Sequence, residues 1–287
     1  MPTTPRVFED PKQLAREIRQ LQAAGKRIGF VPTMGALHAG HLSLAQASAA
    51  KCDVTVVSIF VNPTQFAPGE DFERYPRTWE ADLQLLSSVE PVWVFAPAVE
   101  TMYPPGSSTV VQAAEIARPW EGAQRPIHFD GVCTVVLKLF MAVPADEAFF
   151  GQKDFQQCRV IEQMTHDLLL PITVTRCPII RETDGLALSS RNRYLSAEER
   201  ERALAISAGL AEAQRRIEAG ERNALILSQV VRESLTTAGI TEIDYVAVAD
   251  PRNLESVETI AREVVILVAV RVGTTRLIDN LWLPNLK

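Results

Sequence analysis

Through the first two-thirds of the chain, short runs of almost continuous apolar residues alternate with segments of helical period. The apolar runs predict strands at residues 27–33, 53–61, 91–97, 147–152 and 172–179. The segments between them predict helices at residues 40–51, 78–88, 131–143 and 155–169. Strands that are apolar at almost every position are typical of a parallel sheet covered on both faces. The pattern therefore predicts an α/β fold with helices on both faces of a parallel sheet.

The pattern changes after residue 183. Ser196 and Glu199, three residues apart, form a capping box that opens a long helix to about Glu218. A second helix follows, and then two strands, EIDYVAVAD and EVVILVAVRVG, with no helix between them. This order is typical of α+β organisation. We therefore expect two domains, a larger one at 1–183 and a smaller one at 184–287.

The composition is that of an ordinary globular protein. The 287 residues are 47% hydrophobic and 22% charged, which leaves enough apolar mass for a core. The net charge of −6 argues against nucleic acid or an anionic membrane as the main partner. No apolar run reaches the roughly 18 residues of a membrane span, and the N-terminus lacks the charged-then-apolar order of a signal peptide. We therefore expect a soluble, cytoplasmic protein.

The cysteines show no spacing that indicates a disulfide scaffold or a metal site. They are scattered in or beside apolar segments, at Cys52, Cys133, Cys158 and Cys177. No CxxC pair is present, so neither a disulfide scaffold nor a structural zinc site is indicated. The spacing predicts buried free thiols.

The segment PTMGALHAGH (32–41) lies where the first predicted strand gives way to a helix, and it holds two of the four histidines. In parallel α/β sheets, ligands bind beyond the carboxyl ends of strands, at this kind of join. Gly35 and Gly40 bracket four residues, as in the phosphate loop GxxxxGK[ST]. However, His41 and Leu42 occupy the lysine and hydroxyl positions, so this is not a kinase-type phosphate loop. A nicotinamide cofactor is unsupported because no GxGxxG is present.

The segment still offers a helix N-terminus and two imidazoles, His38 and His41. The free N–H groups and the helix dipole favour an anion, and a histidine can donate to phosphate oxygens. Two alternatives remain at this point. The pair can be structural, or it can bind a metal because residues three apart share a helix face. No third ligand stands at a suitable spacing, so no metal site is predicted.

The His-x-Gly-His pattern at a strand-to-helix turn resembles the HIGH signature of the nucleotidyltransferase superfamily that includes class I aminoacyl-tRNA synthetases. Several further motifs occur in order: VSIFVNPTQF (57–66), YPRT (75–78), RPIHFDGVCTVVLKLF (125–140), FFGQKDFQQ (149–157), DGLALSSRNRYLS (184–196) and RLIDN (276–280). Together they span nearly the whole chain and closely resemble the pantoate–β-alanine ligases.

The resemblance implies ATP-dependent condensation of (R)-pantoate with β-alanine to pantothenate, through a pantoyl adenylate, with release of AMP and pyrophosphate. It implies a Rossmann-like domain at 1–183 that binds nucleotide and pantoate, a C-terminal lid domain at 184–287, and a homodimer. The partners are therefore small molecules: ATP, pantoate and β-alanine. Mg²⁺ is expected to arrive on the phosphates of ATP and not in an all-protein cage.

The resemblance also assigns residues. His41 is the expected proton donor, and His38, Lys153 and Arg191 are expected beside it on the phosphates. The expected ATP contacts are Met34, Gly35, Ala36, Leu37, His38, Ala39, Gly40, His41, Gly151, Gln152, Lys153, Asp154, Ile180, Leu188, Ser189, Ser190 and Arg191. The expected contacts for pantoate and β-alanine are Asn62, Gln65, Arg125, His128 and Gln157. An amide suits a hydroxy acid because it both donates and accepts hydrogen bonds.

One departure from the family pattern is visible. The family has FGEKD where this chain has FGQKD, so Gln152 removes one negative charge beside Lys153. We expect altered affinity and not loss of function. Two rival interpretations stay open: another HIGH-type nucleotidyltransferase, which would want extra cationic residues for a second phosphoryl group, and a catalytically silent nucleotide-binding protein. The latter would be free to lose His38, His41, Lys153 or Arg191, and all four are present.

Overall fold

The computed structural model describes residues 4–67, 69–70 and 72–286. The chain forms two compact units. The first unit contains residues up to 114, 125–152 and 157–178. The second unit contains residues 115–124, 153–156 and those from 179 on. Two short segments that come before residue 179 in the chain, 115–124 and 153–156, therefore belong to the second unit.

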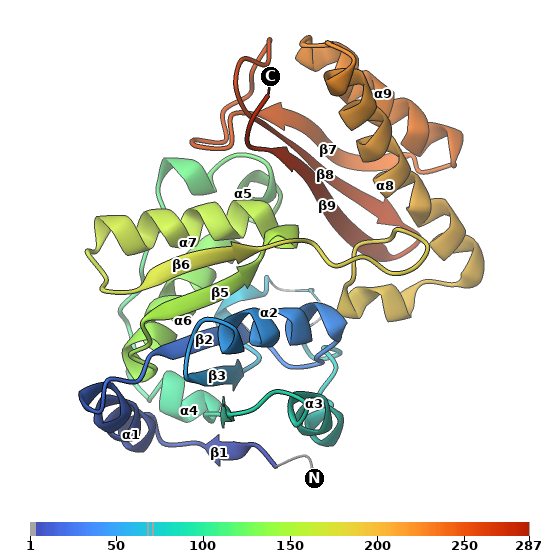
Figure 1. The fold of residues 1–287 in the computed structure, drawn as a ribbon. Helices are drawn as coiled ribbons and strands as arrows, with labels where there is room; N and C mark the ends of the chain where they lie inside the picture. The colour runs from blue at the N-terminus through green and yellow to red at the C-terminus, as the bar shows by residue number, and fades with distance from the viewer. Residues whose placement is uncertain (1–3, 68, 71, 287) are drawn as a thin grey trace. The chain divides into compact units, whose positions relative to one another are not determined.

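The first unit is built on a six-stranded sheet in the order β1-β4-β3-β2-β5-β6 (Figure 1). Its strands are β1 (Arg6–Phe8), β2 (Ile28–Thr33), β3 (Val54–Ile59), β4 (Val92–Phe95), β5 (Glu147–Gly151) and β6 (Thr173–Cys177). Every pairing in it is parallel. This confirms the parallel α/β sheet that the continuous apolar runs predicted.

Helices cover both faces of this sheet. They are α1 (Pro11–Ala23), α2 (Ala39–Ala49), α3 (Trp79–Leu86), α4 (Val99–Met102), α6 (His128–Ala142) and α7 (Phe155–Asp167). Right-handed crossovers put α2 and α3 on one face and α1, α6 and α7 on the other. The side chains of β2 agree, because Phe30 contacts Phe140 of α6 edge to face whereas Val31 packs with Leu44 and Leu86.

The strand order creates a topological switch point beside β2. From β2 the chain runs to β3 on one side, and it returns later to β5 on the other side. The loops that follow β2 and β5 therefore diverge at the carboxyl edge of the sheet. Ligands of open α/β sheets bind at such a point. The His-x-Gly-His segment follows β2 directly, and Gly151 ends β5.

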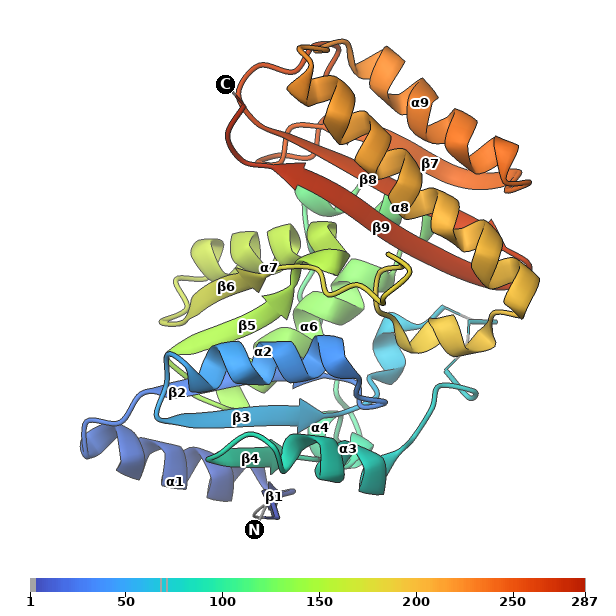
Figure 2. The same cartoon turned by 45° about the vertical axis from the view of Figure 1, so that its right-hand side comes forward.

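The second unit has an antiparallel sheet in the order β7-β8-β9, with two long helices over it (Figure 2). The strands are β7 (Glu242–Ala249), β8 (Val264–Val272) and β9 (Thr275–Leu283), and the helices are α8 (Ala197–Glu218) and α9 (Ala224–Thr237). The short helix α5 (Glu121–Gln124) also belongs to this unit. The core packs Ile206 and Leu227 of the helices against Val268 of the sheet. The predicted capping box of Ser196 and Glu199 is present.

The structure contains elements that the apolar pattern did not predict. The strand β1 has three residues, which is too short for a periodic signal. The helix α1 begins at an Asp10 cap followed by Pro11, which is a local start signal and not part of the apolar pattern. The strand β9 makes the second sheet three-stranded and not two-stranded. Asp279 and Asn280 interrupt its run of apolar residues, so the apolar pattern does not indicate a strand here.

The four cysteines are free and buried, as predicted. Burial raises the pKa of the Cys133 thiol to about 12, which keeps it protonated at neutral pH. Among the described residues, no helix is both long and apolar enough to cross a membrane.

Candidate active site

The loop after β2 has a backbone conformation that needs particular residues. Gly35 has φ +78° and Ala36 has φ +50°, so two successive residues are left-handed. A side chain at position 35 would place its Cβ 3.0 Å from Cγ2 of Ile59 and 3.2 Å from Oδ2 of Asp82. Only glycine avoids both the strain and the crowding. The turn therefore brings the backbone close to β3 and α3.

A buried carboxylate, Asp82 of α3, holds this loop. Its Oδ2 accepts from the N–H of Ala36 at 3.0 Å, and its Oδ1 accepts from the N–H of Leu37 at 2.8 Å. The hydroxyl of Thr78 donates to the same Oδ1 at 2.9 Å. Asp82 is 2% exposed, so its carboxylate cannot be hydrated by bulk water. The backbone N–H groups donate the hydrogen bonds that water would otherwise provide. Sequence reasoning missed Asp82; the available signal was an acidic residue on the inward side of an apolar helix.

The two histidines stand together at the start of α2. His38 is the N-cap residue, and its Nδ1 accepts from the N–H of Gly40 at 3.1 Å. With Nδ1 as acceptor, the neutral ring carries its proton on Nε2. The rings of His38 and His41 have centroids 4.1 Å apart and planes inclined by 34°. His38 thus has a structural capping role in addition to any chemical one.

Past the end of β3, the side chain of Asn62 organises a second group of polar residues. It caps the short 3-10 turn η1 (Pro63–Gln65) and is 1% exposed. Its Nδ2 donates to Oε1 of Gln65 at 3.1 Å and to the carbonyl of Gly131 at 3.2 Å. Its Oδ1 accepts from the hydroxyl of Tyr103 at 2.8 Å. Both ends of this amide are therefore engaged, and they fix the amide of Gln65.

The side chain of Gln65 joins this group to the loop after β2. Its Nε2 lies 3.0 Å from Sδ of Met34, a weak acceptor. Its own backbone carbonyl is contacted by Nδ1 of His128 at 3.0 Å and by the guanidinium of Arg125 at 3.3 Å. The predicted residues Met34, Gln65, Arg125 and His128 are thus brought into one connected group.

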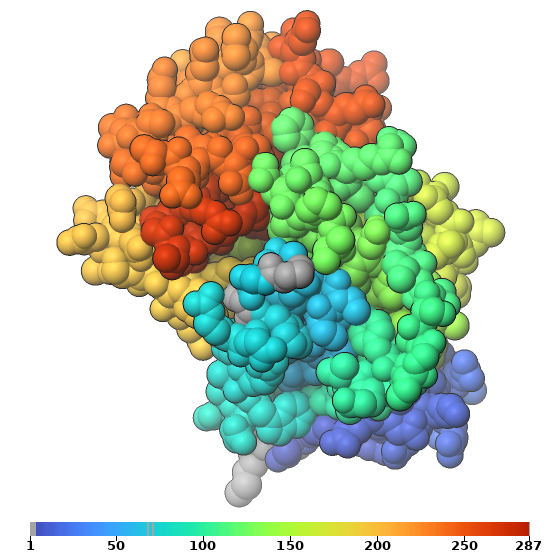
Figure 3. All heavy atoms as spheres, turned by 180° about the vertical axis from the view of Figure 1, so that it is seen from behind, coloured from blue at the N-terminus to red at the C-terminus, as the bar shows by residue number. Residues whose placement is uncertain are grey.

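Arg125 is itself held by Glu70, with two hydrogen bonds of 2.8 and 2.7 Å. Burial opposes the ionisation of Glu70, but the hydrogen bond and charge of Arg125 outweigh it, so the pKa of Glu70 is lowered. The carboxylate of Glu70 therefore stays ionised at neutral pH. In Figure 3 the loop after β3, in cyan, lies on the surface of the first unit.

Gly131 of α6 allows the helix to approach this loop. A Cβ at position 131 would lie 2.4 Å from the carbonyl oxygen of Thr64 and 2.7 Å from Cα of Gln65. Backbone atoms cannot give way as a flexible side chain can. The glycine therefore sets the distance between α6 and the residues predicted to hold the acid substrate.

The remaining predicted ATP contacts belong mostly to the second unit. Lys153 lies in the 3-10 turn η3 (Gln152–Asp154), 3.7 Å from the carboxylate of Asp154, and its backbone carbonyl accepts from Asn280 at 2.9 Å. Ser189 caps the 3-10 turn η4 (Ser190–Tyr194) by accepting from the N–H of Arg191 at 3.3 Å.

The predicted residues are divided between the two units. In the first unit lie Met34, Gly35, Ala36, Leu37, His38, Ala39, Gly40, His41, Asn62, Gln65, Arg125, His128, Gly151, Gln152 and Gln157. In the second unit lie Lys153, Asp154, Ile180, Leu188, Ser189, Ser190 and Arg191. It stays a prediction that residues of both units contact the same ATP molecule. Within the described residues, no three His, Cys, Asp or Glu side chains are grouped as metal ligands.

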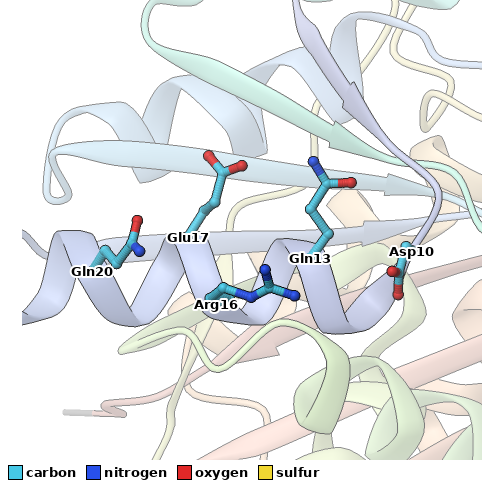
Figure 4. Close-up of a pocket in the computed structure, with 5 residues that line it drawn as sticks. All are labelled: Asp10, Gln13, Arg16, Glu17 and Gln20. Atoms are coloured by element: carbon cyan, nitrogen blue, oxygen red, sulfur yellow. The ribbon is translucent and has the colours of Figure 1, made fainter.

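A polar surface pocket lies along α1 and is separate from these residues. Its lining residues are Asp10, Gln13, Arg16, Glu17 and Gln20 (Figure 4). All five side chains come from the single helix and its cap, and none was predicted to bind a substrate. The carboxylate of Glu17 is paired with Arg6. The pocket therefore carries no functional assignment.

The first unit is an open parallel α/β sheet with a glycine turn and a pair of histidines at its switch point, and an antiparallel α+β unit follows it. This architecture defines the class of α/β proteins that bind ligands beyond the carboxyl ends of their strands. The family model described as pantoate-beta-alanine ligase matches residues 6–282. The chain belongs to the pantoate–β-alanine ligase family.

Relatives and solved structures agree with this assignment. A pantothenate synthetase of Thermosipho africanus is 50% identical over 274 residues, covering 96% of this chain and 97% of that one. Pantothenate synthetase 1 of Bradyrhizobium diazoefficiens is 50% identical over 284 residues, covering 98% and 100%. The crystal structure of pantothenate synthetase from Thermus thermophilus has a TM-score of 0.87 at 41% identity, covering 96% and 98%.

A further solved structure carries ligands. It is a pantoate-beta-alanine ligase from Francisella tularensis, described as complexed with beta-gamma ATP and beta-alanine. It has a TM-score of 0.77 at 34% identity, covering 97% of each chain. The relationship therefore spans nearly the whole chain and includes both units.

Proposed function

We propose that this member of the family ligates (R)-pantoate to β-alanine in two ATP-dependent steps, through a pantoyl adenylate. The observation that carries the proposal is the pair His38 and His41 at the start of α2, at the switch point of a chain that matches the family over residues 6–282. The ligand-bound relative, with ATP and β-alanine as its named ligands, supports the substrate classes.

In the first step a carboxylate oxygen of pantoate attacks the α-phosphorus of ATP. The bond from that phosphorus to the bridging oxygen breaks, and pyrophosphate leaves with its Mg²⁺. Negative charge builds on the phosphate oxygens and has to be met by fixed donors. The N-terminus of α2 and His38 supply such donors, and His41 is the proposed proton donor. Lys153 and Arg191 add positive charge from the second unit.

The acid substrate is proposed to lie by the group around Gln65. Asn62 holds Oε1 of Gln65, so the amide presents its Nε2 in one orientation. That Nε2 lies against the sulfur of Met34. A hydroxyl or carboxylate oxygen is a much better acceptor than a thioether and can replace it. Gln157, in the first turn of α7, is the second amide proposed for pantoate.

In the second step the amine of β-alanine attacks the acyl carbon of the adenylate, and AMP leaves. Arg125 and His128 hold the backbone carbonyl of Gln65 and so support the proposed second substrate site. The adenylate hydrolyses readily and has to be kept from water. We propose that residues 184–287 act as a lid over the substrate-binding domain at 1–183. A homodimer and a cytoplasmic location are further proposals, which rest on the family resemblance.

The two-step scheme is tested by following both products. ATP and pantoate without β-alanine should release pyrophosphate with little AMP, because the adenylate stays bound. Addition of β-alanine should then release AMP and form pantothenate. Equal release of AMP without β-alanine would show that the intermediate is not protected.

The division of roles is tested by two variants. Lys153→Ala should lower the adenylation rate by orders of magnitude, since it removes a charge that acts as phosphorus is attacked. Gln157→Ala should raise the pantoate KM, at a cost of about 1–3 kcal/mol in binding, and leave ATP binding almost unchanged. Titration of ATP and pantoate into each variant measures this. Equal loss of ATP affinity in both would contradict the assignment.

A further inference from the structure

The residues that precede Arg191 form a hairpin-like frame. The N–H of Glu182 donates to the carbonyl of Leu186 at 2.8 Å, and the N–H of Leu188 donates to the carbonyl of Ile180 at 2.9 Å. The turn between them closes at Gly185, which has φ +94°. Two predicted ATP contacts, Ile180 and Leu188, are therefore hydrogen-bonded neighbours.

This frame is anchored to the sheet of the second unit. Arg181 makes two hydrogen bonds with Asp279 of β9, at 2.6 and 3.1 Å. The carboxylate of Asp279 is buried, with a side chain 3% exposed. Because one partner is buried and the contact is bidentate, this pair fixes the base of the frame.

The carboxylate of Glu182 makes a different kind of contact. Its Oε1 accepts from Nδ2 of Asn192 at 2.7 Å, and its Oε2 accepts from the guanidinium of Arg200 at 2.6 Å. Arg200 belongs to α8, which is firmly started by its capping box. Asn192 is buried, and it also donates to the carbonyl of Ala187 at 3.0 Å. One carboxylate therefore ties the turn η4 to a fixed helix.

Asn192 is the residue directly after Arg191. Both lie in η4, a 3-10 turn that begins with the weak cap from Ser189 to the N–H of Arg191 at 3.3 Å. Rotation of this turn would move the guanidinium of Arg191 by more than it moves the backbone, because the side chain is long. The bond from Asn192 to Glu182 opposes such rotation.

We propose that Glu182 is a positioning residue for Arg191, acting through Asn192, and that Arg200 keeps Glu182 in place for this role. The inference rests on the proposed function, in which Arg191 contacts the phosphates of ATP. Glu182 itself touches neither substrate in this scheme. Its role is to hold the guanidinium of Arg191 in position while the α-phosphorus of ATP is attacked.

The neighbouring Asp184 provides a matched control. Its Oδ2 accepts from the same Arg200, at 2.6 and 3.0 Å, and its Oδ1 accepts from the N–H of Leu186. Within the described residues, Asp184 makes no hydrogen bond or ion pair with Asn192 or another residue of η4. Glu182→Gln and Asp184→Asn each remove one negative partner of Arg200. Only the former also weakens the bond to Asn192, because the charged acceptor becomes a neutral amide that has one oxygen for the two donors, Asn192 and Arg200.

The experiment measures single-turnover adenylation and thermal unfolding in both variants. Glu182→Gln should lower the maximal adenylation rate by about tenfold to a hundredfold, the range for a misplaced catalytic group. Asp184→Asn should stay within about twofold, as expected for a partly exposed ion pair. The pantoate KM and the melting temperature should be similar in the two variants. Equal adenylation rates in the two variants would overturn the inference.

A double variant decides whether the effect passes through Arg191. Arg191→Ala should slow adenylation, and adding Glu182→Gln to it should lower the rate no further. Additive losses would overturn the inference but leave the proposed function standing. If Arg191→Ala is as fast as the wild type, the assigned role of Arg191 fails and the inference fails with it. Should Glu182→Gln not fold, Asn192→Ala breaks the same contact, and a wild-type rate in it would equally overturn the inference.

Discussion

The loop after β2 and the segment from Ile180 to Tyr194 both carry residues proposed to contact ATP, yet they are held by opposite means. In the first loop, the backbone N–H groups of Ala36 and Leu37 bond to the buried carboxylate of Asp82. In the second, the base is fixed by Arg181 and the buried Asp279, but the turn that carries Arg191 is tied to α8 through the ion pair of Glu182 with Arg200, which is about one-third exposed. A buried backbone anchor resists salt and has little freedom, whereas partly exposed ion pairs are screened and can open.

This difference fits two roles. A loop that carries His38 and His41 at a helix start has to be in place before the nucleotide arrives, because preorganised donors cost no reorganisation during the reaction. The segment that carries Arg191 belongs to the proposed lid, and a lid has to move, which low local stability allows. The two segments therefore predict different responses to substitution, and four experiments test that contrast.

The largest effect is expected on the rate of adenylation in His41→Ala. Loss of one transition-state donor should slow the step by about 10²–10³. The melting temperature should hardly change, because the frame of the loop depends on Asp82 and Gly35 and not on this ring. Single-turnover release of pyrophosphate and a thermal melt measure the two quantities. An early melt with a wild-type rate would indicate a structural histidine instead.

The next effect is expected on stability in Asp82→Ala. Two buried N–H groups, those of Ala36 and Leu37, would lose their acceptor, at a cost of about 2–5 kcal/mol. Asp82→Asn keeps one acceptor oxygen and should lose roughly half as much. Urea unfolding of both variants measures the difference. If both unfold at the wild-type midpoint, the carboxylate does not hold the loop.

A smaller effect is expected in Gly35→Ala, with Gly25→Ala as its control. The two glycines have φ of +78° and +79°, but nothing lies within 4 Å of a Cβ at Gly25. Gly25→Ala should therefore cost only the left-handed strain, about 1–2 kcal/mol. Gly35→Ala should cost more, because Ile59 and Asp82 crowd the new methyl group, and it alone should slow adenylation. Equal losses of stability and rate in the two variants would contradict the role given to this turn.

The smallest effect concerns pH and the second segment. Partial burial opposes the ionisation of Asp184, but the N–H of Leu186 and the guanidinium of Arg200 outweigh it, so the pKa lies below its ordinary 3.8. A carboxyl group whose pKa is lower in the folded than in the unfolded protein stabilises the fold at pH values above its unfolded-state pKa. This stabilisation is lost as the pH falls through the folded-state pKa. The difference in melting temperature between wild type and Asp184→Asn should therefore shrink below about pH 4. A constant difference would mean that the charge of Asp184 is not involved.

The amino-acid sequence determined the features that depend on near neighbours along the chain. Apolar residues at almost every strand position indicated a sheet buried on both faces, because each residue then meets a helix on one face or the other. The capping box of Ser196 and Glu199 was readable because its partners are three residues apart. The histidines at the start of α2 were readable because a strand, a glycine turn and a helix follow one another directly.

The tertiary structure alone decided the contacts between distant residues. Asp82 holds a loop about 45 residues earlier in the chain, and Glu121 of α5 accepts two hydrogen bonds from Arg276, which lies 155 residues later. Such partners depend on strand order and on which face a helix covers, and neither is contained in a local pattern. For the same physical reason, residues 115–124 and 153–156 belong to the second unit although the apolar pattern placed them within the first domain.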